Sequence, residues 1–291
     1  MSKMQQTIIM DDKASKIFIF EQVHDFKAAQ KKAEEKKLNA FGKMAKFNIL
    51  NRPKVGTVHL VQKEVRLEPF WYIEANKVVD YDHHSIYQVD VPNAYVQSIE
   101  IEGQSYKVAR NDDGASVSLS ALEKCYRKIY YKTSIDGLKR YVYPDAFIKY
   151  SEKFKLNEIR AIDDSHNMIQ PKLSQIEVIK QARDVLNKEI INAHEVHQNV
   201  ITFDKVYLCL VPIFAFKFEW ETGDEPGVIE VNGLTGKLKE NGEWYDDKVT
   251  QSFTREMMIE TSSNLDSELT IQDMEAKKID NNDNDNDNDN D

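Results

Sequence analysis

Cysteine is scarce in this chain of 291 residues, and what little there is carries no pattern. The only two, Cys125 and Cys209, lie far apart in the sequence. This usage excludes a disulfide framework and a zinc module built on paired cysteines. It is typical of proteins that work in a reducing compartment.

Long apolar segments are also missing. The first 16 residues lack the apolar core of a secretory signal. The longest apolar run, residues 206–220, is interrupted by Pro212 and Lys217 and is shorter than the roughly 20 residues that a membrane helix needs. We therefore expect a cytoplasmic protein without a membrane partner.

The motifs of the common enzyme classes are absent too. The chain has no G-x-S-x-G, no Walker-type phosphate loop and no G-x-G-x-x-G. Cys209 lies in an apolar stretch and is interpreted as a buried small hydrophobe. Cys125 lies among Lys124, Arg127 and Lys128, cations that would lower the pKa of its thiol, but a catalytic role is not the favoured interpretation. We predict no catalytic residue and no cofactor.

Hydrophobic residues make up 41% of the chain and aromatic residues 10%, which is enough for a sizeable core. Helical spacing of apolar residues favours helices at 25–46, 118–134 and 174–193. In the last of these, Ser174 followed by Glu177 has the form of a capping box. Alternation of apolar and polar residues favours strands at 55–79, 85–108 and 200–244. The sequence therefore predicts an α+β fold.

The two halves of the chain show the same order of patterns, namely a helix, an apolar strand with one proline, and a turn between strands. This order predicts an internal duplication of a helix plus antiparallel-sheet unit, with Pro69 matched to Pro212 and Val91 to Val231. The expected divisions are a flexible N-terminus (1–20), a first unit (21–110), a connecting segment with a short helix (111–172), a second unit (173–246) and a polar, largely disordered tail (247–291).

The acidic end of that tail, residues 281–291, has no apolar side chain to bury, and its carboxylates repel one another. It also lacks the turn glycine and the bidentate glutamate of a calcium loop. We expect it to be disordered.

A short motif near the end of the second unit resembles a known family. The stretch "VNGLTGKL", with Val231, Asn232, Thr235, Gly236 and Lys237, resembles the last hairpin of PepSY-type domains. The resemblance covers about residues 174–244, and implies a small non-catalytic module that modulates a partner protein. The chain departs from that family in having Asn232 at the acidic turn position and in lacking an export signal. The glycines alone also suffice to build a plain hairpin.

The histidines form two weak candidate metal clusters. His83 and His84 follow two aspartates, but adjacent residues of a strand point to opposite faces, and a polar turn is the favoured interpretation. His194 and His197 fall at the end of the helix predicted at 174–193. They are three residues apart, not four as in a zinc-protease helix, and are favoured there by the helix dipole. No metal site is predicted.

The net charge of −10 is unevenly placed. Basic residues are concentrated at 27–54 and at 124–141, and in the second segment they alternate with tyrosines, a composition that suits single-stranded nucleic acid. The candidate binding residues are Lys124, Arg127, Lys128, Tyr130, Tyr131, Lys132, Lys139 and Arg140.

Three functions are consistent with these observations. The first is a non-catalytic module that binds a protein partner or acts as a scaffold. The second is a nucleic-acid-binding accessory protein. The third is a metal-dependent hydrolase built on the histidines. The oligomeric state is not indicated.

Overall fold

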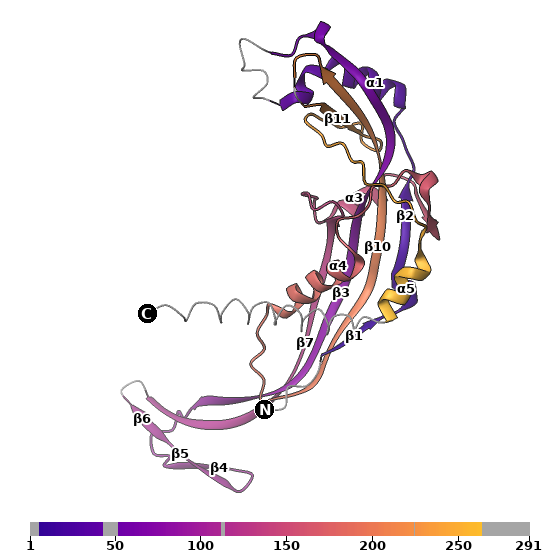
Figure 1. Cartoon of the computed structure of the whole chain (residues 1–291). Helices are drawn as coiled ribbons and strands as arrows, with labels where there is room; N and C mark the ends of the chain where they lie inside the picture. Colours follow the sequence, from indigo (N-terminus) through magenta and orange to yellow (C-terminus); the bar gives the residue numbers. More distant parts are fainter. Residues whose placement is uncertain (1–5, 43–51, 112–113, 224, 264–291) are drawn as a thin grey trace, which may run out of the picture. The chain divides into compact units, whose positions relative to one another are not determined.

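The computed structural model describes residues 6–42, 52–111, 114–223 and 225–263. About half of these residues form β-strands and about a fifth form helices. The predicted α+β fold is therefore wrong, because the chain is mostly β, with one large sheet (Figure 1). None of the helices in the described part of the chain has the length and apolar character needed to cross a bilayer.

The strands are β1 (Thr7–Met10), β2 (Ser15–Phe20), β3 (Val58–Asp90), β4 (Ser98–Ile101), β5 (Gln104–Lys107), β6 (Ala109–Asn111), β7 (Gly114–Asp136), β8 (Leu156–Ile159), β9 (Ala161–Ile162), β10 (Glu195–Trp220), β11 (Gly227–Asn232), β12 (Leu238–Lys239) and β13 (Phe253–Thr254). The α-helices are α1 (Phe26–Glu35), α3 (Ala146–Ser151), α4 (Gln175–Asn187) and α5 (Arg255–Ser263). Short 3₁₀ turns lie at Asp12–Ala14, Lys37–Phe41, Val55–Thr57 and Asp164–His166.

The main sheet has nine strands, and its central path runs β12-β11-β10-β3-β7-β6. Strand β11 pairs antiparallel with β10, whereas β2 pairs parallel with β10 and antiparallel with β8. The sequence of β10 is apolar on both faces from Val206 to Phe216, and almost all of these side chains are buried. Such a continuous apolar run is typical of a strand that is covered on both sides.

The chain divides into two compact units, and each is assembled from three stretches of sequence. The first unit contains residues 1–9, 76–130 and 186–202. The second contains residues 10–75, 131–185 and 203–291. In the second unit, helix α1 packs on β11 (Figure 1). The helix buries Ala29 and Ala33 in a cluster with Phe214 and Phe216 of β10.

Residues 118–134 form part of strand β7, so the helix predicted there is wrong. Even-numbered side chains from Ser118 to Lys132 are exposed, and the odd-numbered ones are mostly half-buried. This period of two is the period of a strand. The segment is also rich in tyrosine, isoleucine and threonine, which favour strands because they fit a pleated, half-buried surface. This preference prevails over the helical spacing of its apolar residues.

The helix predicted at 174–193 is confirmed at its start and is shorter at its end. The capping box is present, because the Ser174 amide donates to Glu177 Oε2 at 2.7 Å and the Glu177 amide donates to Ser174 Oγ at 3.3 Å. Helix α4 ends at Asn187, and β10 begins at Glu195. His194 and His197 are therefore not on a helix, and the predicted dipole interaction does not occur.

The duplication predicted together with the α+β fold is also wrong. Residues 25–107 supply a helix, one long strand and the hairpin β4–β5, which forms a separate two-stranded sheet. Residues 174–244 supply a helix, one long strand and the pair β11–β12, which stays in the main sheet. Val91 and Val231 are consequently not at equivalent positions, because Val91 directly follows β3 and Val231 lies within β11.

Both ends of the chain contain more structure than we expected. Residues 15–20, placed in a flexible N-terminus by the sequence, form β2, with Ile17 and Phe20 buried. Residues 255–263, placed in the tail, form α5. The acidic stretch 281–291 lies outside the described residues.

Candidate functional site

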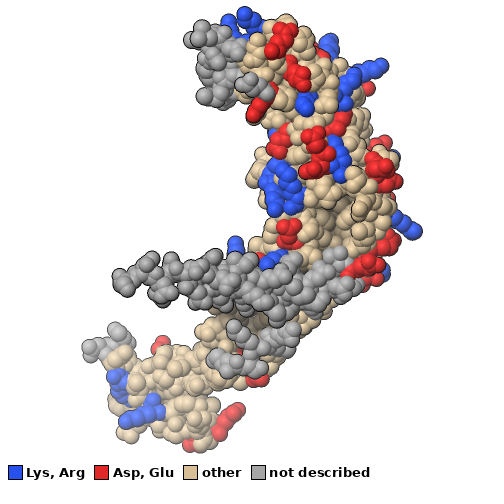
Figure 2. Space-filling model, viewed as in Figure 1, with Lys and Arg blue, Asp and Glu red and all other residues tan. Residues whose placement is uncertain are grey.

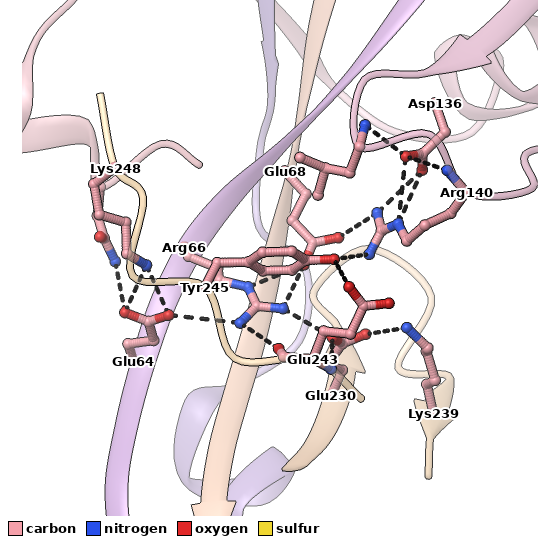
Figure 3. A network of polar contacts seen from close by, with 12 residues as sticks. Glu64, Arg66, Glu68, Asp136, Arg140, Glu230, Lys239, Glu243, Tyr245 and Lys248 are labelled. Carbon is pink, nitrogen blue, oxygen red and sulfur yellow. Dashed lines mark hydrogen bonds and ion pairs between the residues drawn. The ribbon is translucent and has the colours of Figure 1, made fainter. Parts of the chain in front are cut away.

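A buried arginine organises the polar centre of the second unit (Figure 3). Arg66, on β3, has no exposed side-chain surface. Its Nη2 donates to Glu68 Oε1 at 2.6 Å and to Glu230 Oε1 at 2.8 Å, while its Nε donates to Glu68 Oε1 at 2.9 Å. Its Nη1 donates to the Glu243 carbonyl at 3.0 Å. A guanidinium carries its five donors in a rigid fork, so it can hold several acceptors in fixed positions at once.

A second arginine continues the network. Arg140 Nη2 donates to Glu68 Oε2 at 2.7 Å and to Asp136 Oδ2 at 3.0 Å. Burial alone would lower the pKa of Arg140, but the carboxylates of Glu68 and Asp136 raise that pKa above its ordinary value. Glu68 thus joins the two arginines.

Tyr245 closes the network on its other side. Its ring lies 4.7 Å from the guanidinium carbon of Arg66, a cation–π contact, and its hydroxyl donates to Glu243 Oε2 at 2.6 Å. Burial first, and then this hydrogen bond, raise the pKa of Tyr245, while the same hydrogen bond lowers the pKa of Glu243. Lys239 Nζ lies 3.1 Å from Glu230 Oε2. Each carboxylate around Arg66 therefore has a partner.

A cavity of about 740 Å³ opens beside this network. Its lining includes three charged residues of the network, which we call the charged wall: Glu68, Asp136 and Arg140. Lysines and turn residues of the β11–β12 hairpin also line the cavity. The apolar residues of the lining, which we call the apolar wall, are Phe70, Val142, Ala146, Tyr150, Val211 and Ile213. Volume and lining are both typical of a binding pocket, because apolar walls supply affinity and a few fixed polar groups supply orientation.

Two exposed tyrosines belong to the lining of this cavity. Tyr141 is 77% exposed and Tyr143 is 61% exposed. Their rings pack edge to face with centroids 5.3 Å apart, and Lys149 Nζ lies 5.7 Å from the Tyr143 ring. Tyrosine is enriched among the residues that dominate binding interfaces, so these two side chains are candidates for contact with a bound molecule.

A second cavity, of about 660 Å³, lies at the start of α4 beside Trp71 and Met258. Its lining includes few charged groups, and one of them, Glu177, is used by the capping box. The cavity beside Arg140 is the better candidate, because it combines an apolar wall with a fixed charged one.

The structure separates the binding residues predicted from the sequence. In the first unit, Lys124 and Lys128 are exposed on the same face of β7 as Tyr130, whereas Arg127 forms an ion pair with Glu189. In the second unit, Tyr131 is half-buried, and burial raises its pKa. Lys132 and Lys139 are exposed, and Arg140 belongs to the network around Arg66. The predicted set is therefore not one surface.

The four histidines of the candidate metal clusters are all in the first unit. His83 Nδ1 lies 2.8 Å from the Asn192 carbonyl, and the rings of His84 and His194 pack edge to face with centroids 4.2 Å apart. His197 Nε2 lies 2.9 Å from Asp82 Oδ1. No local pattern indicates that residues 82–84 and 194–197 meet, because they are brought together by the pairing of β3 with β10.

Sequence reasoning missed Arg66, Glu68 and Glu230. A usable signal was present in "EVRLEP", where Glu64, Arg66 and Glu68 are two residues apart within a predicted strand. Side chains at that spacing share one face, so three charges on one face of a strand imply a charged cluster.

Comparisons with protein-family models, with curated proteins and with solved structures found no match to this chain.

Proposed function

We propose that this chain is a non-catalytic, cytoplasmic binding module whose second unit holds a segment of a partner protein in the cavity beside Arg140. The observation that carries the proposal is a cavity lining that contains both apolar side chains and charged side chains held by ion pairs. The widely separated free cysteines support a reducing compartment. The resemblance of residues 174–244 to PepSY-type domains points to the same kind of module.

The charges of the cavity indicate what the partner segment carries. The carboxylates of Glu68, Asp136 and Glu230 are engaged by arginine or lysine side chains. Lys237, on the same lining, is exposed. A segment with a large apolar or aromatic side chain next to an aspartate or glutamate fits this arrangement, because the apolar group fills the cavity and the carboxylate meets Lys237.

The experiment is to select short peptides from a displayed random library on the immobilised full chain. We expect enrichment of peptides that place a large apolar residue beside an acidic one. Tyr141→Ala and Lys237→Glu change exposed residues, and each should weaken binding about tenfold, which corresponds to roughly 1.4 kcal/mol. Tyr126→Ala and Lys128→Glu, at exposed positions of the first unit, are the matched controls and should leave binding unchanged. Failure to enrich any peptide, or equal binding by the Tyr141 and Lys237 variants, would contradict the proposal.

A second candidate function, binding of single-stranded nucleic acid, is favoured by one specific observation. Along β7, Lys124, Tyr126, Lys128 and Tyr130 are all exposed and occupy alternate positions, and Lys128 Nζ lies 5.1 Å from the Tyr130 ring. Alternate residues of a strand are roughly 6.6 Å apart, so this row offers cations and stacking surfaces in turn.

The surface charge favours the protein partner over the nucleic acid. On the face seen in Figure 2, acidic and basic side chains are intermixed over the described residues, and no broad surface of one sign is visible there. Titration with a single-stranded oligonucleotide distinguishes the two functions. If the row on β7 binds it, affinity should fall by roughly 0.7 log units per log unit of salt for each phosphate contacted. Lys128→Glu should weaken this binding, and removal of the acidic residues 281–291 should strengthen it at low salt.

A further inference from the structure

Three neighbouring strands of the first unit direct polar side chains to one place on the sheet. Strand β3 contributes Asp82, β7 contributes Lys124, and β10 contributes Glu195 and His197. Glu195 and His197 are two residues apart in β10, so both side chains leave the same face of the strand. One oxygen or nitrogen atom from each of Asp82, Glu195 and His197 lies within 4.8 Å of the others.

Asp82 is the unusual member of this group. The residue is only 3% exposed, yet its Oδ1 receives no hydrogen bond. Its nearest polar neighbour is His197 Nε2, at 2.9 Å, which is close enough for an ion pair. The other oxygen, Oδ2, accepts a hydrogen bond from Lys124 Nζ at 2.6 Å. A buried carboxylate oxygen whose only close partner is an exposed imidazole is incompletely satisfied, and a metal ion bound jointly by Asp82 and His197 would satisfy both groups.

We propose that Asp82, Glu195 and His197 bind one divalent transition-metal ion, with Zn²⁺ as the best fit. Each residue would supply one ligand atom: Asp82 Oδ1, a carboxylate oxygen of Glu195 and Nε2 of His197. One imidazole nitrogen with two carboxylate oxygens suits Zn²⁺, whereas Mg²⁺ and Ca²⁺ favour oxygen ligands throughout. This site is separate from the cavity of the second unit and does not depend on the proposed function.

The dimensions of the cluster fit that ion. With bond lengths near 2.0–2.2 Å, the ligand atoms of a tetrahedral Zn²⁺ are roughly 3.3–3.6 Å apart. A cluster already within 4.8 Å therefore needs only small side-chain movements. Glu195 and His197 are exposed and can make these movements, while buried Asp82 is held in place by Lys124. Lys124 acts as a positioning residue, because it fixes the carboxylate and leaves Oδ1 for the metal.

Three protein ligands leave a fourth position for water or for another side chain. His84 follows Asp82 by two residues, and His194 directly precedes Glu195. The rings of these two histidines are in contact with each other. In the described geometry they are not members of the three-residue cluster.

The test uses Zn²⁺ alone, added to the chelator-treated full chain, with binding followed by calorimetry and Co²⁺ substitution followed by visible absorption. We expect one tight site per chain and a Co²⁺ spectrum of low-coordinate type. His197→Asn and Glu195→Gln alter exposed side chains, and each should weaken binding at least about tenfold, which corresponds to roughly 1.4 kcal/mol.

His59→Asn is the matched control. His59 Nε2 lies 3.0 Å from Glu221 Oε1, so it belongs to a histidine–carboxylate pair in which both side chains are exposed and no buried aspartate takes part. Its substitution should leave Zn²⁺ affinity unchanged. The absence of a tight site, or equal affinity in the wild type and the His197 variant, would overturn the proposal. The same conclusion would follow if only His84 or His194 substitutions removed binding, because the metal would then have other ligands.

Discussion

Two places in the second unit have the same backbone arrangement with different side chains, and we call them the Pro69 junction and the Pro212 junction. In the first, the Gly137 amide donates to the Pro69 carbonyl at 3.0 Å. In the second, the Gly233 amide donates to the Pro212 carbonyl at 2.8 Å. The glycine carbonyl then accepts two consecutive amides in each case, from Lys172 and Leu173 at Gly137 and from residues 23 and 24 at Gly233. The residue after each pair of amides caps a helix: Ser174 caps α4 and Asp25 caps α1.

The side chains around the two junctions differ in charge. Glu68 precedes Pro69, whereas Val211 precedes Pro212. Asp136 precedes Gly137 and pairs with Arg140, whereas Asn232 precedes Gly233. Both short side chains accept the amide two residues ahead, at 2.8 Å in Asp136 and 3.0 Å in Asn232. Since the Pro212 junction forms with the neutral Val211 and Asn232 at these two positions, the charges of Glu68 and Asp136 are not required by the backbone. This supports a role in binding for the charged wall.

The largest expected effect comes from breaking the charged network at its centre. Arg66→Met leaves Glu68 and Glu230 buried beside a neutral side chain, and should lower the free energy of unfolding by about 3–5 kcal/mol. The three tryptophans, at 71, 220 and 244, all belong to the second unit, so urea unfolding followed by tryptophan fluorescence measures this loss.

Two further variants sharpen that result. Cys209 lies three residues before Pro212, as Arg66 lies three before Pro69, and Cys209→Ala should cost only about 1 kcal/mol because it removes one buried apolar group. Adding Glu68→Gln and Glu230→Gln to Arg66→Met should recover part of the loss. An Arg66→Met effect no larger than that of Cys209→Ala would show that the network contributes little.

The next effect tests whether the two backbones are equivalent. A Cβ added at Gly137 or at Gly233 would lie 2.8 Å from the carbonyl oxygen of the facing proline, so the strands must shift. Gly137→Ala and Gly233→Ala should each cost about 1–3 kcal/mol. Gly56→Ala is the control, because a Cβ at that position meets no atom within 4 Å. If one of the two substitutions is tolerated as well as Gly56→Ala, the junctions are not equivalent.

These junctions also show which features a sequence can predict. The capping box at Ser174 depends on residues three apart, and it was predicted correctly. The strand character of 118–134 was missed, because a helical stripe and a strand alternation coexist in the same residues and the pairing of β7 with β3 decides between them. The pairing of Gly137 with Pro69 and the meeting of Arg66 with Glu230 join residues distant in the sequence, so no local pattern contains them. The candidate cavity depends on the same long-range pairings.

A smaller effect comes from exchanging the two acceptors. Asp136→Asn keeps an oxygen for the Leu138 amide but removes the charge that faces Arg140, and should cost about 1–2 kcal/mol, because hydrogen bonds to charged groups are worth more than neutral ones. Asn232→Asp keeps the oxygen for the Leu234 amide and faces no arginine among its hydrogen-bond partners, so a change of about 0.5 kcal/mol or less is expected. Equal losses in the two variants, measured by urea unfolding, would mean that the charge at Asp136 adds nothing.

The smallest effect concerns the two helix caps and depends on pH. At the Pro69 junction, the backbone amide of Ser174 is the main cause that lowers the pKa of Glu177 below its ordinary value of 4.5. A carboxyl group whose pKa is lowered in the folded state stabilises the fold when the pH is above the pKa of that group in the unfolded chain. This contribution disappears as the pH falls through the folded pKa. At the Pro212 junction, Asp25 caps α1 through the Ala28 amide at 2.9 Å, and the position that corresponds to Glu177 is Ala28 itself.

Glu177→Gln keeps the capping geometry and removes only the charge. At pH 7 it should lower the free energy of unfolding by a few tenths of a kcal/mol, roughly the value of one charge near a helix start. As the pH falls through the folded pKa, the carboxyl group becomes protonated in both states, so the difference in stability between the wild type and the variant should shrink. Asp25→Ala should cost about 1 kcal/mol at pH 7 through loss of the cap itself. Urea unfolding of both variants at pH 7 and pH 3 measures these differences. A Glu177→Gln difference that persists unchanged at pH 3 would show that shape, not charge, is what Glu177 contributes to the cap.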